Sequence, residues 1–325
     1  MEIRKDKTLR EIFIRRLTMN KIAFVFPGQG AQYVGMGKEF YDAYPEAKEV
    51  FQLAGVVSGL DMEKLVFTEN EQLNITEYTQ IAMLAAEVAA WKVLESKGIK
   101  ADVCAGLSLG EYGALAVCDV MDLKDLFRVI RKRGIYMQEA YPTGGAMSAV
   151  LGLDALTVEA VCEKTEGIVS VANYNCPGQI VITGEEAAVN KAAEALMQAG
   201  AKRCIPLKVS GPFHSALLKD AGEKLYEELK DVTVRAPKIP YLTNVTADYV
   251  TSDENIKELL KQQVSSSVRF WQSIEKMIAD GVNVFIEIGP GKTLNGFIRK
   301  ISREVKVLNL DKLADLERVM EELSC

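Results

Sequence analysis

Short apolar segments that alternate with longer helical patterns constrain the fold of this chain more than any other feature. KIAFVF (21–26) leads through the glycine-rich turn PGQGAQYVGMG (27–37) into helical patterns, and ADVCAG (101–106) leads through a tight turn into a small-residue helix. A long helical pattern over 76–97 lies between them. Strands that alternate with helices indicate a mainly parallel sheet with helices on both faces, so we predict an α/β core.

The middle of the chain follows a different pattern. Residues 144–209 give strand AMSAVLG, a helix over 154–164, strands IVSVANYN and QIVITG, a helix over 185–199 and strand KRCIPLKV. This β-α-β-β-α-β order is the ferredoxin-like arrangement. We predict a ferredoxin-like subdomain at 144–209, inserted into a core made of 19–143 and 210–325, with one joint at Gly144 and Gly145 and the other at 210–212.

The two ends of the chain complete this outline. After 210 we predict a helix over 215–230, the strand KIPYLTNVT (238–246), helices near 253–263 and 267–279, and VNVFIEIG (282–289) as the last buried strand. Residues 1–18 carry six basic and three acidic side chains and precede Met19, where the strand pattern begins. A terminal segment without a packing partner seldom belongs to the folded body. We therefore expect 1–18 to be an extension outside the fold.

Charge and cysteine content exclude several classes of function. The 325-residue chain has 45 acidic and 39 basic residues, a net charge of −6, so it has no bulk charge for binding nucleic acid. Its six cysteines form no C-x-x-C pair, which indicates reduced thiols in a cytosolic protein and no metal site. No apolar run approaches the ~20 residues that cross a bilayer, and no secretory signal is present. We predict a cytoplasmic protein without membrane contact.

The candidate nucleophile is Ser108. The G-x-S-x-G nucleophile elbow, in which a serine occupies a strained turn between a strand and a helix, is matched by GLSLG (106–110). A plain strand-turn-helix corner is the alternative interpretation. A serine hydroxyl needs a base, and the chain has one histidine, His214, in the segment GPFH. No Asp or Glu stands out as the third member of a triad.

Two glycine-rich turns imitate nucleotide-binding loops. GQGAQ (28–32) would need a glycine at position 33 for the Rossmann pattern, and that residue is Tyr33. GPGKT (289–293) would need a glycine in place of Ile286 for the P-loop. A backbone amide in the turn at 28–32, together with the amide of Leu109, would instead suit an oxyanion hole. A simple turn between strand and helix is the alternative.

Three successive cations precede the predicted subdomain. Arg131, Lys132 and Arg133 lie in a helical pattern over 123–139, where such a run is most often a solvated helix face. One arginine turned inward would form a bidentate clamp for a substrate carboxylate, which a lysine could not reproduce.

Six sequence blocks resemble one enzyme family. The chain is similar to malonyl-CoA:acyl carrier protein transacylases of fatty-acid synthesis in the ordered blocks FVFPGQGAQYVGMG, GLSLGEY, RGIYMQEA, ANYNCPGQIVITG, GPFH and EIGPGKTL. The resemblance runs from Met19 to about residue 310. It implies an α/β-hydrolase-like core with a ferredoxin-like insert, in agreement with the pattern described above.

The resemblance also implies roles for individual residues. It makes Ser108 the acylated nucleophile and His214 its base, with Arg133 holding the malonyl carboxylate. The other implied positions are the oxyanion-hole amides of Gln29 and Leu109, a backbone carbonyl of Gln263 that orients the histidine in place of an acid, and pocket residues Phe213, Asn173 and Asn175. Many relatives carry histidine where this chain has Leu107, so any role of that imidazole is absent here.

The implied activity is ping-pong transfer from malonyl-CoA, through a malonyl-serine, to the phosphopantetheine thiol of acyl carrier protein. That partner carries the phosphopantetheine, so we expect no cofactor and no metal, and we expect a monomer. Phe213 implies malonyl selectivity, since its ring leaves little room for a 2-methyl branch. An acidic carrier protein would dock on basic side chains, and the candidates are Lys202, Arg203, Arg299, Lys300 and Arg303.

Two other functions stay open at this point. A thioesterase or carboxylesterase on the same core would use water in place of the thiol, but a carboxylate clamp at Arg133 makes little sense for a neutral ester substrate. A non-catalytic carrier-binding scaffold has no need of a serine elbow, so Ser108, His214 and Gln29 together argue against it.

Overall fold

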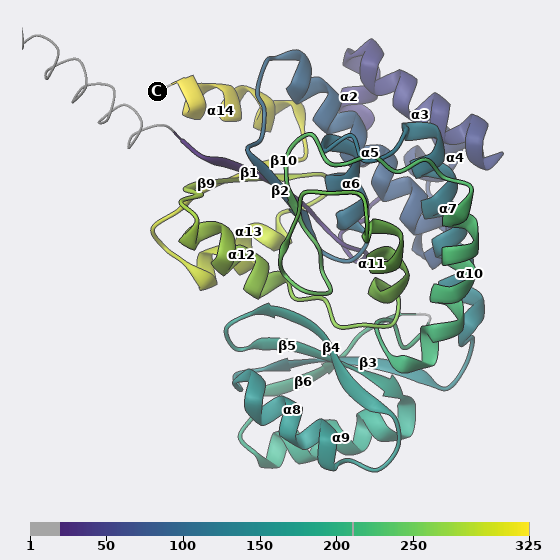
Figure 1. Cartoon of the computed structure of the whole chain (residues 1–325), viewed down its shortest axis with the longest axis vertical. Coiled ribbons are helices and arrows are strands. Elements are labelled where there is room, and N and C mark those ends of the chain that lie inside the picture. Colours follow the sequence, from purple (N-terminus) through teal and green to yellow (C-terminus); the bar gives the residue numbers. More distant parts are fainter. Residues whose placement is uncertain (1–19, 210, 325) are drawn as a thin grey trace, which may run out of the picture.

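The structure, a computed structural model, describes residues 20–209 and 211–324. In this part the chain forms a mixed α/β fold with two sheets, a larger one among helices and a smaller one below it in Figure 1. The predicted extension at 1–18 and the joint residue 210 lie outside the described residues.

The larger sheet is mainly parallel. Its strand order is β10-β9-β1-β2-β7-β8; β7 and β8 pair antiparallel, and the other neighbours pair parallel. The strands are β1 (Ile22–Phe26), β2 (Val103–Gly106), β7 (Tyr241–Leu242), β8 (Tyr249–Val250), β9 (Val284–Ile288) and β10 (Lys306–Leu310). The predicted α/β core with a parallel sheet is confirmed.

Two predictions about this sheet are wrong. The strand predicted over 238–246 is reduced to the two residues of β7, because the chain then turns and Ala247 donates its backbone N–H to the carbonyl of Thr243 at 3.0 Å. VNVFIEIG is not the last strand, since β10 follows it and pairs with β9 from Lys306 to Leu310. β10 is a short edge strand that begins with an exposed lysine, so its apolar pattern is weak.

Helices make up most of the described chain outside the sheets. α5 follows the pattern predicted over 76–97, and α7 carries the predicted run of cations. The helices are α2 (Lys38–Ala43), α3 (Pro45–Ser58), α4 (Met62–Phe67), α5 (Thr76–Ser96), α6 (Gly110–Val117), α7 (Leu123–Ala140), α8 (Ala155–Lys164), α9 (Glu186–Gln198), α10 (Lys219–Lys230), α11 (Ile256–Gln263), α12 (Phe270–Ala279), α13 (Thr293–Ile301) and α14 (Leu313–Ser324), with 3-10 turns η1 (Gln72–Asn74) and η2 (Ala216–Leu218).

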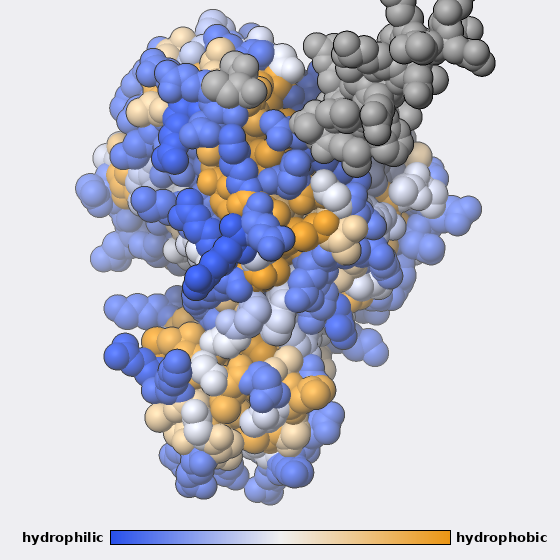
Figure 2. Space-filling model, turned by 90° about the vertical axis from the view of Figure 1, so that its left-hand side faces the viewer, coloured by the Kyte–Doolittle hydropathy of each residue, from blue (hydrophilic) through white to orange (hydrophobic). Residues whose placement is uncertain are grey.

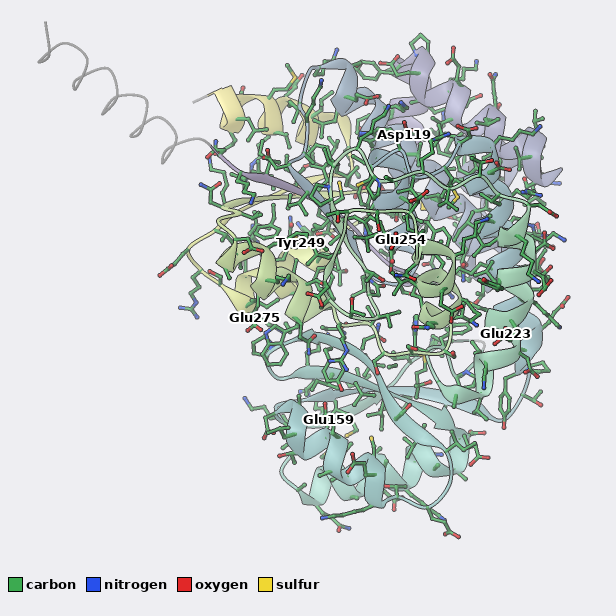
Figure 3. The ribbon with its side chains drawn as sticks, in the orientation of Figure 1. Asp119, Glu159, Glu223, Tyr249, Glu254 and Glu275 are labelled. Carbon is green, nitrogen blue, oxygen red and sulfur yellow. The ribbon has the colours of Figure 1, made fainter. Side chains whose placement is uncertain are left out.

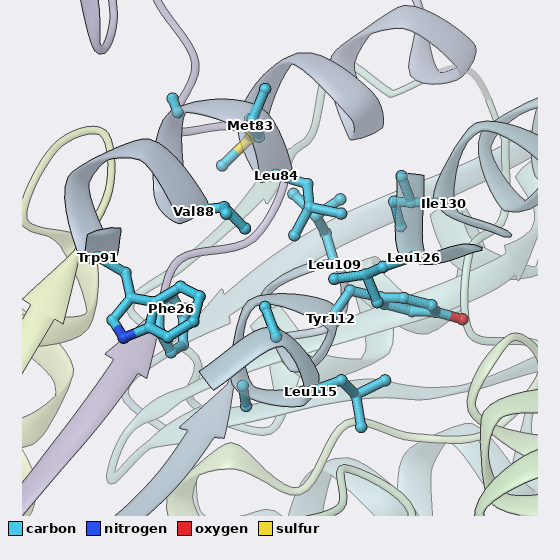
Figure 4. Packing of buried hydrophobic residues seen from close by; sticks show 14 of the residues in the cluster. Phe26, Met83, Leu84, Val88, Trp91, Leu109, Tyr112, Leu115, Leu126 and Ile130 are labelled. Atoms are coloured by element: carbon cyan, nitrogen blue, oxygen red, sulfur yellow. The ribbon is translucent and has the colours of Figure 1, made fainter. Parts of the chain in front are cut away.

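Apolar residues on both faces of the larger sheet hold helices against it. Phe24 and Phe26 of β1 belong to the large cluster that includes α5, α6 and α7, and Figure 4 shows Leu84, Tyr112 and Ile130 in that cluster. The alternate residues of β1 belong to a second cluster with α12 and α13. Side chains alternate along a strand, so one apolar strand packs against both layers, as the sequence predicts.

The smaller sheet is antiparallel with the strand order β4-β5-β3-β6. Its strands β3 (Gly145–Leu151), β4 (Val169–Cys176), β5 (Gln179–Glu185) and β6 (Arg203–Pro206) alternate with α8 and α9 in the order β-α-β-β-α-β. Val150 and Ile182 pack in the cluster under these two helices. Their neighbours Ala149 and Val181 point to the opposite face and line a pocket.

The segment that follows α11 ties the smaller sheet to the rest of the molecule. Val268 donates its backbone N–H to Ala172 at 2.7 Å and accepts a hydrogen bond from the N–H of Tyr174 at 2.9 Å. β4 is therefore fixed beside residues 263–268, which also contact the candidate active site.

Charged side chains are spread over the surface. Figure 3 labels acidic residues in well-separated helices and turns, namely Asp119, Glu159, Glu223, Glu254 and Glu275. Within 20–209 and 211–324, no group of three or more His, Cys, Asp or Glu side chains could hold a metal ion. None of the helices in the same residues is both long enough and apolar enough to cross a membrane.

Candidate active site

A pocket of about 270 Å³ lies where the ends of the parallel strands face the smaller sheet. The surface is indented where the two parts of the molecule meet (Figure 2). The carboxyl ends of β1 and β2 open into the pocket, which is where open parallel sheets place their ligands. It is lined by Gln29, Ser108, Leu109, Arg133, Asn173, Asn175, Phe213 and His214, all of which the sequence analysis singled out.

Ser108 occupies a sharp turn between β2 and α6. Its φ is 56°, a left-handed conformation that costs a residue with a side chain about 1–2 kcal/mol. The glycines on either side permit the turn, because a Cβ on Gly106 would lie 1.9 Å from the backbone of Gly110, and a Cβ on Gly110 would lie 2.0 Å from the carbonyl oxygen of Phe26. This is the strained geometry that the elbow motif predicts.

His214 lies against the serine hydroxyl. Its Nε2 is 2.7 Å from Ser108 Oγ, and its Nδ1 lies 2.9 Å from the backbone oxygen of Gln263 and 3.1 Å from that of Ser266. Two carbonyl oxygens can only accept, so Nδ1 carries the proton. Nε2 is left with its lone pair toward the serine, the tautomer that a general base needs.

The histidine is held in its neutral form. Burial, and after it the positive charge of Arg133, together lower the pKa of His214 to about 4, although the hydrogen bonds to the carbonyls of Gln263 and Ser266 act in the opposite direction. An imidazole with this pKa is an unprotonated acceptor throughout the neutral range.

Arg133 is the one member of the cationic run that turns inward. Its side chain is 1% exposed, whereas Arg131 pairs with Glu77 and Lys132 pairs with Glu228 nearer the surface. The inward arginine is therefore the one that can reach a ligand in the pocket.

The guanidinium of Arg133 is held by three oxygen atoms. It donates from NH1 to Gln80 Oε1 at 2.7 Å, and from NH2 to Gln263 Oε1 at 3.0 Å and to Ser108 Oγ at 3.2 Å. None of these three acceptors belongs to a carboxylate. A buried cation whose three hydrogen-bond acceptors are all neutral is ready to bind an anionic group.

The two turns that carry the predicted amides pack against each other, and Gln29 and Leu109 both line the pocket. Leu109 is the N-cap residue of α6, where backbone N–H groups have no partner within the helix. The turn that contains Gln29 is packed on the elbow, since a Cβ on Gly28 would lie 2.6 Å from the carbonyl oxygen of Leu107. The side chain of Gln29 donates to Thr76 Oγ1 at 3.0 Å, which fixes the turn to α5.

Three further predicted residues line the pocket from its other walls. Asn173 and Asn175 come from β4 and are 7% and 6% exposed. Phe213 precedes the histidine and is 6% exposed. These residues contribute polar amides on one wall and an aromatic ring on another.

Sequence analysis missed Asn244, which holds the elbow. Its Oδ1 accepts from the backbone N–H of Ser108 at 2.7 Å, and its Nδ2 donates to the carbonyl of Gly106 at 2.6 Å. One amide side chain thus bridges both sides of the strained turn. It lies 136 positions from Ser108 in a stretch that reads as a strand, so no spacing signal could have identified it.

Glu111 and Gln80 were also missed. Glu111 is fully buried in the first turn of α6, and its Oε2 accepts from Gln263 Nε2 at 2.6 Å and from the backbone N–H of Asn244 at 3.0 Å. Burial raises the pKa of this carboxyl to about 7, against the effect of these two hydrogen bonds and of Arg133. The E of GLSLGE was the one available sequence signal.

Comparisons with known proteins identify the family. The acyl transferase domain model matches residues 23–315. The malonyl CoA-acyl carrier protein transacylase of Bacillus subtilis (strain 168) is 45% identical over 310 residues, which cover 94% of this chain and 98% of that protein. The chain belongs to the malonyl CoA-acyl carrier protein transacylase family.

Solved structures of the transacylase family have the same fold. The crystal structure of the transacylase from Clostridium perfringens superimposes with a TM-score of 0.91 at 46% identity and covers 94% of this chain and 97% of that one. A transacylase in complex with a type II PKS acyl-carrier protein superimposes with a TM-score of 0.90 at 40% identity and covers 93% of this chain and all (100%) of that one. The family resemblance read from the six sequence blocks is thereby confirmed.

In this transacylase-family chain the five predicted basic side chains fall into two groups. Arg299 and Lys300 are exposed at the end of α13, which packs beside β4, and Arg303 follows. Lys300 donates to Gln179, a residue of the pocket wall, at 3.1 Å. Lys202 and Arg203 lie at β6, at the opposite edge of the smaller sheet from β4, so the five do not form one patch.

Proposed function

We propose that the protein transfers a malonyl group from malonyl-CoA to the phosphopantetheine thiol of an acyl carrier protein, through a malonyl ester of Ser108. The observation that carries the proposal is the position of the Ser108 hydroxyl between His214 Nε2, at 2.7 Å, and Arg133 NH2, at 3.2 Å. A base and a carboxylate clamp on the same hydroxyl fit a short acyl group that ends in a carboxylate. In malonyl-CoA one methylene group separates the carboxylate from the thioester carbonyl. The names of the relatives support the same substrate.

The first half-reaction loads the enzyme. The carboxylate of malonyl-CoA binds the Arg133 guanidinium, and Ser108 Oγ attacks the thioester carbon while its proton passes to His214 Nε2. The amides of Gln29 and Leu109 donate to the oxyanion, and such a donor typically contributes ~3 kcal/mol. The C–S bond then breaks, Nε2 returns its proton to the sulfur of CoA, and the malonyl ester stays on the serine.

The second half-reaction reverses these steps with another thiol. His214 Nε2 takes the proton of the phosphopantetheine S–H, the sulfur attacks the ester carbon, and the proton then returns to Ser108 Oγ as the C–O bond breaks. The backbone carbonyl of Gln263, 2.9 Å from Nδ1, orients the imidazole in place of an acid. This carbonyl is an uncharged acceptor, which suits a Ser108–His214 pair in which the histidine is already neutral.

Selectivity for malonyl is part of the proposal. The ring of Phe213 stands in the pocket wall beside the histidine, where it leaves little room for a 2-methyl branch. A wall of this kind discriminates by only ~1–3 kcal/mol per methyl group. Equal rates with methylmalonyl-CoA and malonyl-CoA would refute the selectivity.

We also propose how the chain is organised. The β-α-β-β-α-β element order with sheet order β4-β5-β3-β6 supports a ferredoxin-like subdomain at 144–209, inserted into an α/β-hydrolase-like core at 19–143 and 210–325. We propose that the chain acts as a monomer, because its own Ser108, His214 and Arg133 already meet in one pocket. The described cysteines are free, which supports a cytoplasmic setting. The reaction as written needs no cofactor and no metal.

The proposed carrier protein docks near α13. A solved relative is a transacylase in complex with a type II PKS acyl-carrier protein, which supports a carrier partner here. Such carriers are acidic, and Arg299, Lys300 and Arg303 place positive charge beside the pocket wall. The second basic group, Lys202 and Arg203, is too far along the smaller sheet to join that surface.

Release of CoA with and without a carrier protein tests the proposed function. Without carrier, malonyl-CoA should release one equivalent of CoA in a burst and then stop. Phosphopantetheinylated carrier protein should restart turnover, whereas carrier that lacks phosphopantetheine should not. Ser108→Ala should abolish both phases.

The same assay separates the other functions. Continuous CoA release without any carrier would make the protein a thioesterase. No burst and no turnover, with a folded protein that still binds the carrier, would make it a scaffold.

A further inference from the structure

The side-chain amide of Gln263 lies between a buried cation and a buried carboxyl group. Its Oε1 accepts from Arg133 NH2 at 3.0 Å, and its Nε2 donates to Glu111 Oε2 at 2.6 Å. Nε2 also lies 3.0 Å from the carbonyl oxygen of Ser108. Gln263 is fully buried, so water cannot substitute for any of these partners.

Only one orientation of this amide satisfies its surroundings. If the amide were rotated by half a turn, its NH2 group would face the Arg133 guanidinium, which can only donate. Its oxygen would face Glu111 Oε2 and the carbonyl of Ser108, which accept. Glu111 is the partner with the shortest hydrogen bond to Gln263, so its acceptor oxygen contributes most to choosing the orientation.

Glu111 is itself held firmly. It belongs to the first turn of α6, one turn beyond the elbow, and the same Oε2 accepts the backbone N–H of Asn244 at 3.0 Å. Its other oxygen, Oε1, makes no hydrogen bond within the described residues. A proton on Oε1 would therefore leave both bonds at Oε2 in place, and the arrangement survives in either ionisation state.

We propose that Glu111 is a positioning residue for the acyl-transfer site: by fixing the amide of Gln263, it holds the Arg133 guanidinium at the Ser108 hydroxyl, where the clamp meets the carboxylate of the acyl group. This inference rests on the proposed function. Through Arg133, Glu111 would contribute to the preference for acyl groups that bear a carboxylate. Ser108 and His214 would still carry out the attack on the thioester.

The test compares acylation of Ser108 by malonyl-CoA and by acetyl-CoA in single-turnover experiments. Glu111→Leu removes the acceptor, and Glu111→Asp withdraws it by about one bond length, ~1.5 Å. Both should lower kcat/KM for malonyl-CoA about 10²-fold, the typical cost of a misplaced group, and lower that for acetyl-CoA much less. Glu111→Gln can still offer an oxygen to both donors, so it should rescue the malonyl preference.

Tyr241→Phe is the matched control. The Tyr241 hydroxyl is buried near Glu111 and has no hydrogen-bond partner within the described residues. The Tyr241→Phe substitution removes a polar atom from the same region and leaves the contacts of Gln263 unchanged. The ratio of kcat/KM for malonyl-CoA to that for acetyl-CoA should therefore stay at the wild-type value.

Each outcome decides a question. If Glu111→Asp and Glu111→Leu keep the wild-type ratio, or slow both substrates equally, Glu111 is structural and the inference fails. If Glu111→Leu does not fold, the ratio in Glu111→Asp alone decides. A wild-type enzyme that shows no malonyl preference would instead refute the proposed function, and the inference with it.

Discussion

Ser108 and His214 meet at 2.7 Å while both hold a left-handed backbone conformation, with φ of 56° and 61°. Two such residues in direct contact store local strain at the point where the chemistry would occur. On the serine side the strain is sustained by Asn244, whose side chain bridges the carbonyl of Gly106 and the N–H of Ser108. The surrounding core therefore determines a serine position that a free turn would not adopt.

The strain at Ser108 predicts an unusual order of stabilities. Ser108→Gly and Ser108→Ala both remove the proposed nucleophile, but glycine accepts φ of 56° without steric cost. Ser108→Gly should therefore be the more stable of the two by about 1 kcal/mol. Urea unfolding of both variants measures the difference, and an alanine variant that is equally stable or more stable would show that the turn is relaxed.

The elbow glycines predict a sharp contrast with another glycine. Gly106→Ala and Gly110→Ala should each destabilise the protein by about 3 kcal/mol or more, because their new Cβ atoms would overlap backbone atoms. Gly296→Ala, in α13 where an added Cβ would meet no atom within 4 Å beyond its chain neighbours and the helix's own backbone, should stabilise it by up to about 1 kcal/mol. Thermal unfolding tests both, and a tolerated Gly106→Ala would contradict the described turn.

The pKa of His214 predicts the pH dependence of serine acylation. The proposed base acts when it is neutral, and with its pKa lowered to about 4 it stays neutral from pH 8 down to about 5. The acylation rate constant should be flat over that range and fall to half near pH 4. Stopped-flow acylation with malonyl-CoA measures it, with tryptophan fluorescence as a check on folding. A midpoint near 6.5 would mean that the histidine is solvated.

Arg133 predicts a substrate-specific loss. Arg133→Lys keeps the charge but cannot reach Gln80 and Gln263 with two separate nitrogens, as the guanidinium does. Charge-assisted hydrogen bonds of ~1.5–3 kcal/mol predict a loss of about 10²-fold in kcat/KM for malonyl-CoA, with little change for acetyl-CoA. An equal loss for both thioesters would assign Arg133 to the fold and not to the acyl group.

The basic group on α13 predicts a defect confined to the carrier protein. Arg299→Glu with Lys300→Glu should raise the KM for carrier protein about tenfold at low salt and leave serine acylation by malonyl-CoA unchanged. Lys202→Glu with Arg203→Glu, at the far edge of the smaller sheet, is the control and should leave the KM near the wild-type value. Equal defects in the two pairs would indicate a nonspecific charge effect.

Local sequence patterns predicted the elements that carry the residues of the proposed catalytic site. The turn at Ser108 is visible because the glycines at 106 and 110 flank the serine in a short motif, although the atoms that exclude a Cβ at Gly110 belong to the distant Phe26. The parallel sheet follows from apolar strands such as β1, whose alternate side chains meet two different layers of helices. These features leave local patterns of residue type, which a single sequence displays.

The supporting network could not be predicted in the same way. Asn244 and Gln80 act through partners more than 50 positions away, and polar residues at those places have no distinctive spacing. The predicted strand at 238–246 failed for the same reason, since Asn244 gives its backbone N–H to Glu111 and not to a neighbouring strand. Long-range hydrogen bonds override a local apolar pattern there.

The mass of the intact protein after brief reaction with malonyl-CoA tests the central claim most directly. We predict one malonyl adduct per chain, located on Ser108 by peptide mapping, absent from Ser108→Ala, and removed when phosphopantetheinylated carrier protein is added. An adduct on another residue, or CoA release by the wild-type protein with no adduct that the carrier can discharge, would contradict transfer through Ser108.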